Sequence, residues 1–138
     1  MVQLLADDKL GALREDYRLP LPNTYYDAFR RIAADPNQEL TVVEQQGELV
    51  ATFQLTLIPY LTYRGGTRAQ LEAVRVKSGY RGQGLGTQLF QYAIERAKAK
   101  GAHVLQLTTD KQRPDAVRFY ESLGFVASHE GMKLHLDS

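Results

Sequence analysis

A basic, glycine-rich turn that joins a strand-like run to a helix-like run constrains this chain most. The run Leu71–Val76 carries apolar and β-branched residues, and a helical pattern starts at Gly86. Glycines in the turn let the backbone approach a ligand closely, and they present N–H groups at a helix N-terminus, where the helix dipole favours negative charge. Arg81 adds a cation. The stretch therefore predicts a strand, an anion-binding loop and a helix, with a phosphate or pyrophosphate as ligand.

The spacing of the glycines excludes two common nucleotide sites. A dinucleotide fingerprint requires glycine at its sixth position, where this chain has Thr87 or Leu89. A P-loop requires Gly-Lys-Ser/Thr, and this tripeptide does not occur in the sequence. The pattern that remains is Arg-x-x-Gly-x-Gly at Arg81, Gly84 and Gly86. By itself, this pattern also fits an ordinary strand-to-helix turn.

Composition excludes several other classes of function. The chain has 138 residues, which predicts a single domain over residues 1–138, and a net charge of +1, which gives no reason to expect nucleic acid as a partner. It has no Cys, so disulfides and a thiol nucleophile are excluded. Because it also has no long apolar run, we expect a cytoplasmic protein with no membrane contact. The three histidines, His103, His129 and His135, do not have the spacing of metal ligands, so no metal is expected.

Hydrophobic periodicity predicts an α/β protein. Helices are predicted over residues 6–17, 24–34, 86–100 and 114–124, and strands over residues 40–44, 49–58, 69–76, 102–108, 125–127 and 132–136. A right-handed crossover through the helix at 86–100 would make the strands at 69–76 and 102–108 parallel. This order of elements predicts a mixed, mostly antiparallel sheet with helices on both faces.

A second motif follows the strand at 102–108. It reads Phe-Tyr-x-x-Leu-Gly-Phe and starts at Phe119 and Tyr120. Its apolar residues share one helical face, which alone is typical of an ordinary core helix. The motif gains meaning from the loop at Arg81–Thr87, which precedes it in the chain by one helix and one strand. With both motifs in this order, the chain resembles the GNAT superfamily of N-acetyltransferases over roughly residues 40–136.

The resemblance implies the acyl-CoA N-acyltransferase fold and acetyl-CoA as the acetyl donor. In this fold the strand at 69–76 splays from the strand at 102–108 and opens a V-shaped cleft. The backbone of Val74, Arg75 and Val76 would then bind pantetheine. The pyrophosphate would lie on the loop formed by Arg81, Gly82, Gln83, Gly84, Leu85, Gly86 and Thr87. Many members use an asparagine for a further pantetheine contact, for which this chain offers Asp110, Gln112 or Arg113, and Phe119 of the second motif is also expected near the cofactor.

Acetylation of an amine benefits from a base, because an ammonium of ordinary pKa is mostly protonated at neutral pH. Glu72 is the carboxylate of the strand at 69–76, and the resemblance implies that it is this base. The alternative is a structural ion pair with Arg64, Arg68 or Arg75. Strand alternation would place Glu72, Val74 and Val76 on one face of the sheet.

Tyr120 is the candidate acid for the departing thiolate of CoA. A phenol within hydrogen-bond reach can protonate that sulfur. The alternative role for Tyr120 is that of a core tyrosine with its hydroxyl bonded to the backbone.

The acceptor is expected to be a small-molecule or peptide amine. The resemblance implies that it lies among Tyr25, Tyr26, Tyr60, Tyr63 and His129. These side chains do not select one amine over another. A non-enzymatic alternative keeps the same fold as a CoA-binding or CoA-sensing module.

Members of the superfamily usually begin with a strand that pairs with the one at 40–45. Here the residues Val2–Leu5 lead almost at once into a helical pattern, so either this first strand is absent or the given sequence starts too late to include it. An edge strand without a partner exposes backbone N–H and C=O groups that a second chain could pair with. The sequence therefore predicts a homodimer.

Overall fold

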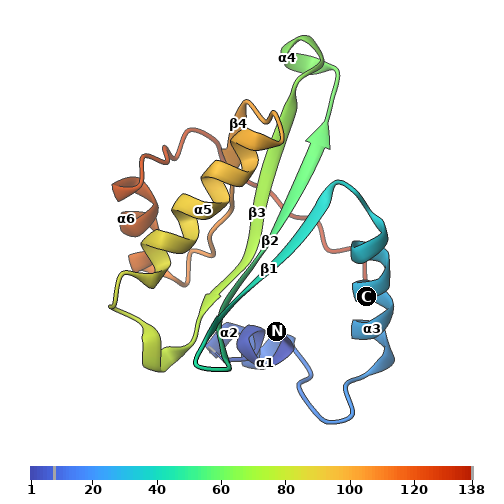
Figure 1. The fold of residues 1–138 in the computed structure, drawn as a ribbon. Coiled ribbons are helices and arrows are strands. Elements are labelled where there is room, and N and C mark those ends of the chain that lie inside the picture. Colours follow the sequence, from blue (N-terminus) through green and yellow to red (C-terminus); the bar gives the residue numbers. More distant parts are fainter. Residues whose placement is uncertain (8, 138) are drawn as a thin grey trace. The chain divides into compact units, whose positions relative to one another are not determined.

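The structure is a computed structural model that describes residues 1–7 and 9–137 (Figure 1). The chain divides into two compact units, Met1–Gln106 and Leu107–Ser138. The first unit contains a four-stranded sheet, and the second contains one helix, α6 (Pro114–Ser122). All residues of the predicted loop and Glu72 belong to the first unit, whereas Tyr120 belongs to the second.

The sheet has the order β1-β2-β3-β4. Its strands are β1 (Gln38–Gln45), β2 (Glu48–Pro59), β3 (Thr67–Val76) and β4 (Val104–Gln106). The first three pair antiparallel, and β4 pairs parallel to β3. The predicted mixed, mostly antiparallel sheet with one parallel crossover is therefore confirmed. Among the described residues no strand pairs with the outer edge of β1, as expected for a sheet without the first strand of the superfamily.

Helix α5 (Leu85–Ala99) covers one face of the sheet (Figure 1). Its apolar stripe forms because residues three and four positions apart lie on the same side of a helix. The stripe is buried and consists of Leu85, Leu89, Phe90, Ala93 and Ala97. It faces strand residues that alternate along β2 and β3, where Phe53, Leu55, Ala69 and Leu71 are buried. The ring of Tyr92 in α5 also packs on the ring of Phe53 in β2, with 6.2 Å between their centroids. We call the side of the sheet that α5 covers the α5 face.

An ion pair also ties β1 to α5. The Glu39 carboxylate accepts two hydrogen bonds from Arg96, from Nε at 2.9 Å and from Nη2 at 2.8 Å. These bonds lower the pKa of Glu39, burial opposes them, and the charges of Arg96 and Lys100 lower the pKa further. Hydrophobic periodicity gave no sign of this pair, because its two residues lie 57 positions apart in the sequence, with β2 and β3 between them.

The N-terminal part differs from the single helix predicted over 6–17. It forms α1 (Val2–Leu5) and α2 (Lys9–Arg14), and then α3 (Asn23–Ala34), which matches the predicted helix at 24–34. Leu4 of α1 is buried, and α1 contacts β2 and β3, so an apolar anchor fixes this short helix on the sheet. Between β2 and β3, α4 (Thr62–Gly65) replaces the predicted open connection, and Tyr63 and Arg64 in it have left-handed φ of 52° and 60°.

Strand β3 contains a bulge at Ala73. Its backbone φ is +56°, and the pairing with β2 shifts between Thr52 and Gln54, so that Glu72 lies opposite Gln54 and Arg75 lies opposite Thr52. Cross-strand partners share a face, and a bulge therefore reverses the alternation beyond it. The prediction that Glu72 and Val76 share a face is wrong, because Val76 lies opposite buried Ala51 on the α5 face.

Three strand predictions also need correction. The strand expected over 102–108 is only Val104–Gln106, because its parallel pairing with β3 covers three residues. The strands expected over 125–127 and 132–136 do not form in the described part of the second unit. A strand requires a partner, and these two segments do not pair with each other.

Candidate active site

Half of β3 is open on the side of β4. The two strands pair only at Arg68, Ala69 and Gln70, and among the described residues no strand pairs with Leu71–Val76 on that side. This is the splayed geometry that the resemblance to the superfamily implied. Two backbone oxygens in the open stretch accept hydrogen bonds from arginine side chains: Arg75 Nη1 donates to the Val74 carbonyl at 2.7 Å, and Arg81 Nε donates to the Val76 carbonyl at 3.0 Å. In this stretch these two backbone carbonyl groups are therefore hydrogen-bonded to side chains and not to a neighbouring strand.

The glycine loop leads from this open stretch into α5. A 3-10 turn, η1 (Ser78–Tyr80), follows β3, and Gly84 caps α5 in the left-handed conformation. Gly82 and Gly84 have φ of +80° and +78°, and a Cβ built on either would meet nothing within 4 Å. Open space therefore lies beside the backbone at the start of α5. Together with the Arg81 guanidinium, this arrangement fits a pyrophosphate.

A carboxylate in the β1–β2 hairpin anchors the approach to this loop. Glu48 accepts hydrogen bonds from Lys77 Nζ and, at 2.7 Å, from the Tyr80 hydroxyl. The Lys77 ammonium lowers the pKa of Glu48, and the Glu48 carboxylate raises the pKa of Lys77 and of Tyr80. Glu48 therefore fixes both ends of η1, directly before Arg81. Sequence analysis missed this anchor, because a glutamate in a hairpin carries no sign of a distant partner.

Glu72 is exposed on the face opposite α5, which we call the polar face. The ion pairs seen among the described residues do not join Glu72 to Arg64 or Arg68. Arg68 instead lies over the Tyr60 ring, 5.0 Å from its centroid, and Arg75 bonds the backbone of Val74. The Glu72 carboxylate therefore remains available for a proton from a bound molecule.

Four carboxamides lie on the polar face together with Glu72. Gln38 Oε1 accepts hydrogen bonds from Gln54 Nε2 at 3.0 Å and from Thr56 Oγ1 at 2.9 Å, and Gln106 Nε2 donates to Gln70 Oε1 at 2.7 Å. Gln54 is the cross-strand partner of Glu72 itself. Sequence analysis did not single out these residues. The signal was present as polar residues at every second position of β2 and β3.

The predicted acceptor tyrosines lie in two places in the first unit. The rings of Tyr60 and Tyr63 lie 6.0 Å apart beside α4, and both contact His103, with the Tyr60 hydroxyl hydrogen-bonded to His103 Nε2. Tyr25 and Tyr26 lie near the start of α3, and Figure 1 shows this end of α3 well away from α4. The structure therefore does not bring the four tyrosines together in one binding site.

The hydroxyl of Tyr25 is already engaged. It accepts from the Asp16 backbone N–H at 2.9 Å and donates to Glu15 at 3.0 Å. The Asp16 bond lowers the pKa of Tyr25, but burial and the Glu15 carboxylate outweigh it and raise that pKa. Tyr25 thus orders the segment before α3, which weakens its case as an acceptor contact.

In the second unit, Tyr120 packs among aromatic rings. Its ring centroid lies 5.8 Å from that of Phe119 and 6.1 Å from that of Phe125, and its backbone oxygen accepts from the Phe125 N–H at 3.1 Å. Asp110 accepts hydrogen bonds from the backbone N–H groups of Gln112 and Arg113, at 2.8 and 2.9 Å, so it organises the turn before α6. The remaining predicted residue of this unit, His129, is exposed and bonds the Ser128 hydroxyl.

Within residues 1–7 and 9–137, no three or more His, Cys, Asp or Glu side chains gather as a metal site would require. In the same residues no helix is both long and apolar enough to cross a bilayer.

Comparison with known proteins gives the chain its relatives. A protein of Bacillus halodurans C-125 whose crystal structure is described as that of a transcriptional regulator is 58% identical, with a TM-score of 0.95 over 99% of this chain and 91% of that one. Among curated proteins, the aminoalkylphosphonate N-acetyltransferase of Salmonella typhimurium is 31% identical over 76% of this chain and 68% of its own length. The [ribosomal protein bS18]-alanine N-acetyltransferase of Escherichia coli is 32% identical over 76% and 74%.

The sequence profile of the acetyltransferase (GNAT) family matches residues 8–125, which include the glycine loop, the open half of β3 and the Phe-Tyr motif. The relatives named above as N-acetyltransferases act on different amines, so they agree on the reaction class and not on the acceptor. With the match spanning most of its length, the chain belongs to the acetyltransferase (GNAT) family.

Proposed function

We propose that this protein transfers an acetyl group from acetyl-CoA to a primary amine by direct attack. The observation that carries the proposal is the continuity of two features: the open half of β3, Leu71–Val76, runs through η1 into a glycine loop with open space beside it. The first feature suits an extended amide-bearing chain such as pantetheine, and the second suits a pyrophosphate. Acetyl-CoA carries both, and its thioester supplies the activated acetyl group.

Each segment from β3 to the start of α5 then binds a different part of acetyl-CoA. The backbone of Val74, Arg75 and Val76 hydrogen-bonds pantetheine after the arginine side chains give up their bonds to this backbone. Arg81 and the backbone from Gly82 to Thr87 hold the pyrophosphate. Glu48 keeps η1, and with it the loop, in place for the phosphate groups. Asp110, Arg113 and Phe119 are proposed as further cofactor-binding residues.

Glu72 serves as the base. Its carboxylate takes a proton from the ammonium form of the acceptor, directly or through a water molecule, and the lone pair of the resulting amine attacks the thioester carbonyl carbon. A C–N bond forms, the C–S bond breaks, and the positively charged nitrogen loses a second proton to solvent. Tyr120 gives its proton to the departing sulfur and regains one from solvent. The exposure of Glu72 on the polar face supports its role.

A release assay tests the proposal. The protein is incubated with acetyl-CoA and a panel of amines, and free CoA thiol is measured with time. We expect thiol release that depends on the amine and an acetylated amine in equal amount. CoA binding without acetylation of any amine would contradict the proposal.

A second candidate function is a CoA-binding module without turnover. It is favoured by the description of the 58% identical Bacillus halodurans protein as a transcriptional regulator. In that case Glu72→Gln and Tyr120→Phe would leave CoA binding intact, since the module needs only the loop.

A further inference from the structure

We infer that the amine acceptor is a polyhydroxylated amine, of the amino-sugar or aminocyclitol class, bound across the polar face of the sheet. This inference rests on the proposed acetyltransferase function and deepens it, because it names the substrate class. It is carried by a row of neutral side chains that crosses all four strands beside the Glu72 carboxylate.

The pairing register builds the row. Gln38 lies opposite Thr56, Thr56 opposite Gln70, and Gln70 opposite Gln106. Cross-strand partners point to the same face, so the four side chains form one line perpendicular to the strands. A second line on this face contains Gln54 opposite Glu72. The carboxamides of Gln54 and Gln70 therefore stand next to the candidate base, one across the strands and one along β3.

The chemistry of the row matches hydroxyl groups. A carboxamide offers both a donor and an acceptor, and a hydroxyl group does the same. The internal bonds of the row use Gln38 Oε1 and Gln70 Oε1 as acceptors, and they use one N–H of Gln54 and one of Gln106. The amide nitrogens of Gln38 and Gln70 and the amide oxygens of Gln54 and Gln106 still have capacity for a ligand. The exposed or half-buried position of these side chains leaves them within reach of solvent.

The dimensions of the face also suit such a ligand. Neighbouring strands lie about 4.8 Å apart, and same-face residues along a strand about 6.6 Å apart. The polar groups thus recur at intervals of roughly the width of one sugar ring, and Glu72 occupies one position among them. An amine carried directly on such a ring would reach Glu72 while its hydroxyl groups meet Gln54 and Gln70.

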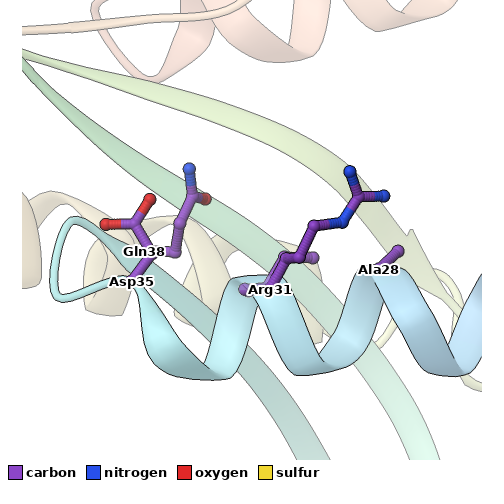
Figure 2. A pocket seen from close by; sticks show the side chains of 5 residues that line it. Ala28, Arg31, Asp35 and Gln38 are labelled. Carbon is purple, nitrogen blue, oxygen red and sulfur yellow. The ribbon is translucent and has the colours of Figure 1, made fainter.

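The β1 end of the row continues into a pocket of about 310 Å³ between α3 and β1, lined by Ala28, Arg31, Ile32, Asp35 and Gln38 (Figure 2). Figure 2 shows the Arg31 and Gln38 side chains directed to the same side of α3. Arg31 and Asp35 offer one charge of each sign, and Asp35 Oδ1 also accepts from the Asn37 N–H at 2.9 Å. The pocket therefore offers hydrogen-bond donors and acceptors to the far end of the ligand, and because its two charges are opposite in sign, the ligand needs no net charge there.

Other amines fit this face less well. A polyamine presents only cationic donors, for which the described face offers few carboxylates: Glu72 beside the row, and Asp35 at its β1 end, where the cationic Arg31 lines the same pocket. An alkyl or aromatic amine would need apolar contacts, whereas the two lines of side chains described above are polar apart from Leu40. A peptide would bury polar backbone on side chains instead of pairing with a strand edge. These classes provide the contrasts for a test.

The test is an acetylation assay with the full chain and six acceptors: glucosamine, 2-deoxystreptamine, glucosamine 6-phosphate, spermidine, butylamine and a tetrapeptide with an N-terminal alanine. We expect the two polyhydroxylated acceptors without a phosphate group, glucosamine and 2-deoxystreptamine, to have kcat/KM at least ten-fold above spermidine, butylamine and the tetrapeptide. Gln54→Met and Gln70→Met keep side-chain length and remove the hydrogen bonds. Each should raise the KM for glucosamine about ten-fold, the loss of one hydrogen bond, and leave the KM for acetyl-CoA unchanged. Gln91→Met, on the exposed side of α5, is the matched control and should change neither KM.

The outcomes separate this inference from the proposed function. Turnover that favours spermidine, butylamine or the tetrapeptide, or equal effects of Gln70→Met and Gln91→Met, would overturn the inference while leaving the acetyltransferase activity intact. If no amine is acetylated, the proposed function fails, and glucosamine binding decides the inference by itself. In a titration followed by NMR, chemical shifts that glucosamine perturbs in the wild-type protein and not in Gln70→Met would support the polar face as its site, and absence of binding would exclude it.

Discussion

Glu72 and Arg75 lie on the same face of β3, although regular alternation would put them on opposite faces. The left-handed Ala73 between them adds one residue to the strand, so that Glu72 faces Gln54 and Arg75 faces Thr52. The same bulge turns Val76 to the α5 face, opposite buried Ala51. A polar face with a carboxylate and an apolar face for packing are thereby both kept through the open half of the strand.

Replacing Glu72 by Gln should remove the base and keep the shape of the site. We expect kcat/KM for the amine to fall by about 100-fold at neutral pH. The loss should shrink as the pH approaches the pKa of the amine, because the free amine then no longer needs deprotonation. The measurement is a pH–rate profile, with the dissociation constant for CoA as the control that should not change. Glu44→Gln, an exposed residue of β1, is the matched variant, and a Glu72→Gln profile equal to that of Glu44→Gln would remove Glu72 as the base.

The bulge itself can be tested at Ala73. Valine is β-branched and tolerates a positive φ poorly, so Ala73→Val should lower the free energy of unfolding by about 2 kcal/mol. Glycine accepts this φ, so Ala73→Gly should stay within about 1 kcal/mol of the wild type. Urea unfolding of the three proteins measures both effects. Equal stability of the valine and glycine variants would show that position 73 is not held in the left-handed conformation in solution.

Gly84 and Gly79 form a matched pair in the loop region. A Cβ would meet open space at both positions, but only Gly84 has a left-handed φ. Gly84→Ala should therefore cost about 1–2 kcal/mol in backbone strain or shift the helix start. Either effect disturbs the N–H groups proposed to bind pyrophosphate, so CoA should bind about ten-fold more weakly, by calorimetry. Gly79→Ala should bind CoA like the wild type, and similar losses for both variants would refute the role of the Gly84 conformation.

The Glu39–Arg96 pair should make stability depend on pH. Because Arg96 lowers the pKa of Glu39 in the folded chain, the stabilisation is complete above the ordinary carboxyl pKa and is lost as the pH falls through the lowered one. Glu39→Gln should cost about 1 kcal/mol or less at pH 7, since solvent screens a partly exposed pair. Its unfolding free energy should also vary less with pH in the acid range. Glu95→Gln, which removes an exposed pair within α5, is the control, and parallel pH curves for wild type and Glu39→Gln would contradict the assignment.

Tyr120→Phe removes a hydroxyl and keeps the aromatic packing with Phe119 and Phe125. If Tyr120 protonates the thiolate, kcat should fall about ten-fold or more, with an unchanged dissociation constant for acetyl-CoA. Phe125→Leu is the comparison for packing alone and should act mainly on thermal stability. A normal kcat in Tyr120→Phe would assign Tyr120 to the aromatic core only.

The elements with strong periodicity were predictable from sequence. α5 and α3 follow their apolar stripes, and β2 and β3 follow alternation and β-branched composition, so their bounds are correct to within two residues or so. The bulge was not predictable, because alanine, unlike glycine or asparagine, gives no sign of a left-handed φ. The strands expected near the C-terminus failed for a related reason, since alternation shows that a segment can form a strand but not that a partner exists.

The candidate site was only half visible for the same physical reasons. The glycine loop is local, so its spacing alone separated it from dinucleotide and P-loop sites. The anchor at Glu48 and the carboxamide row depend on register between strands, which a single sequence does not reveal. Each glutamine of the row looks like an ordinary exposed strand residue until its neighbours on the other strands are known.

The bulge at Ala73 also bears on how this chain can vary over evolutionary time. Strand pairing on both sides of Ala73 is regular, so the bulge corresponds to one extra residue in β3. One additional codon in the gene is enough to encode it. A lineage that deletes this codon would keep every hydrogen-bonded partner of β3 and bring Glu72 one residue nearer to the glycine loop. The spacing between the glutamate and the Arg-x-x-Gly-x-Gly loop is therefore expected to differ by one among relatives, and an alignment that forbids gaps there would misplace the glutamate.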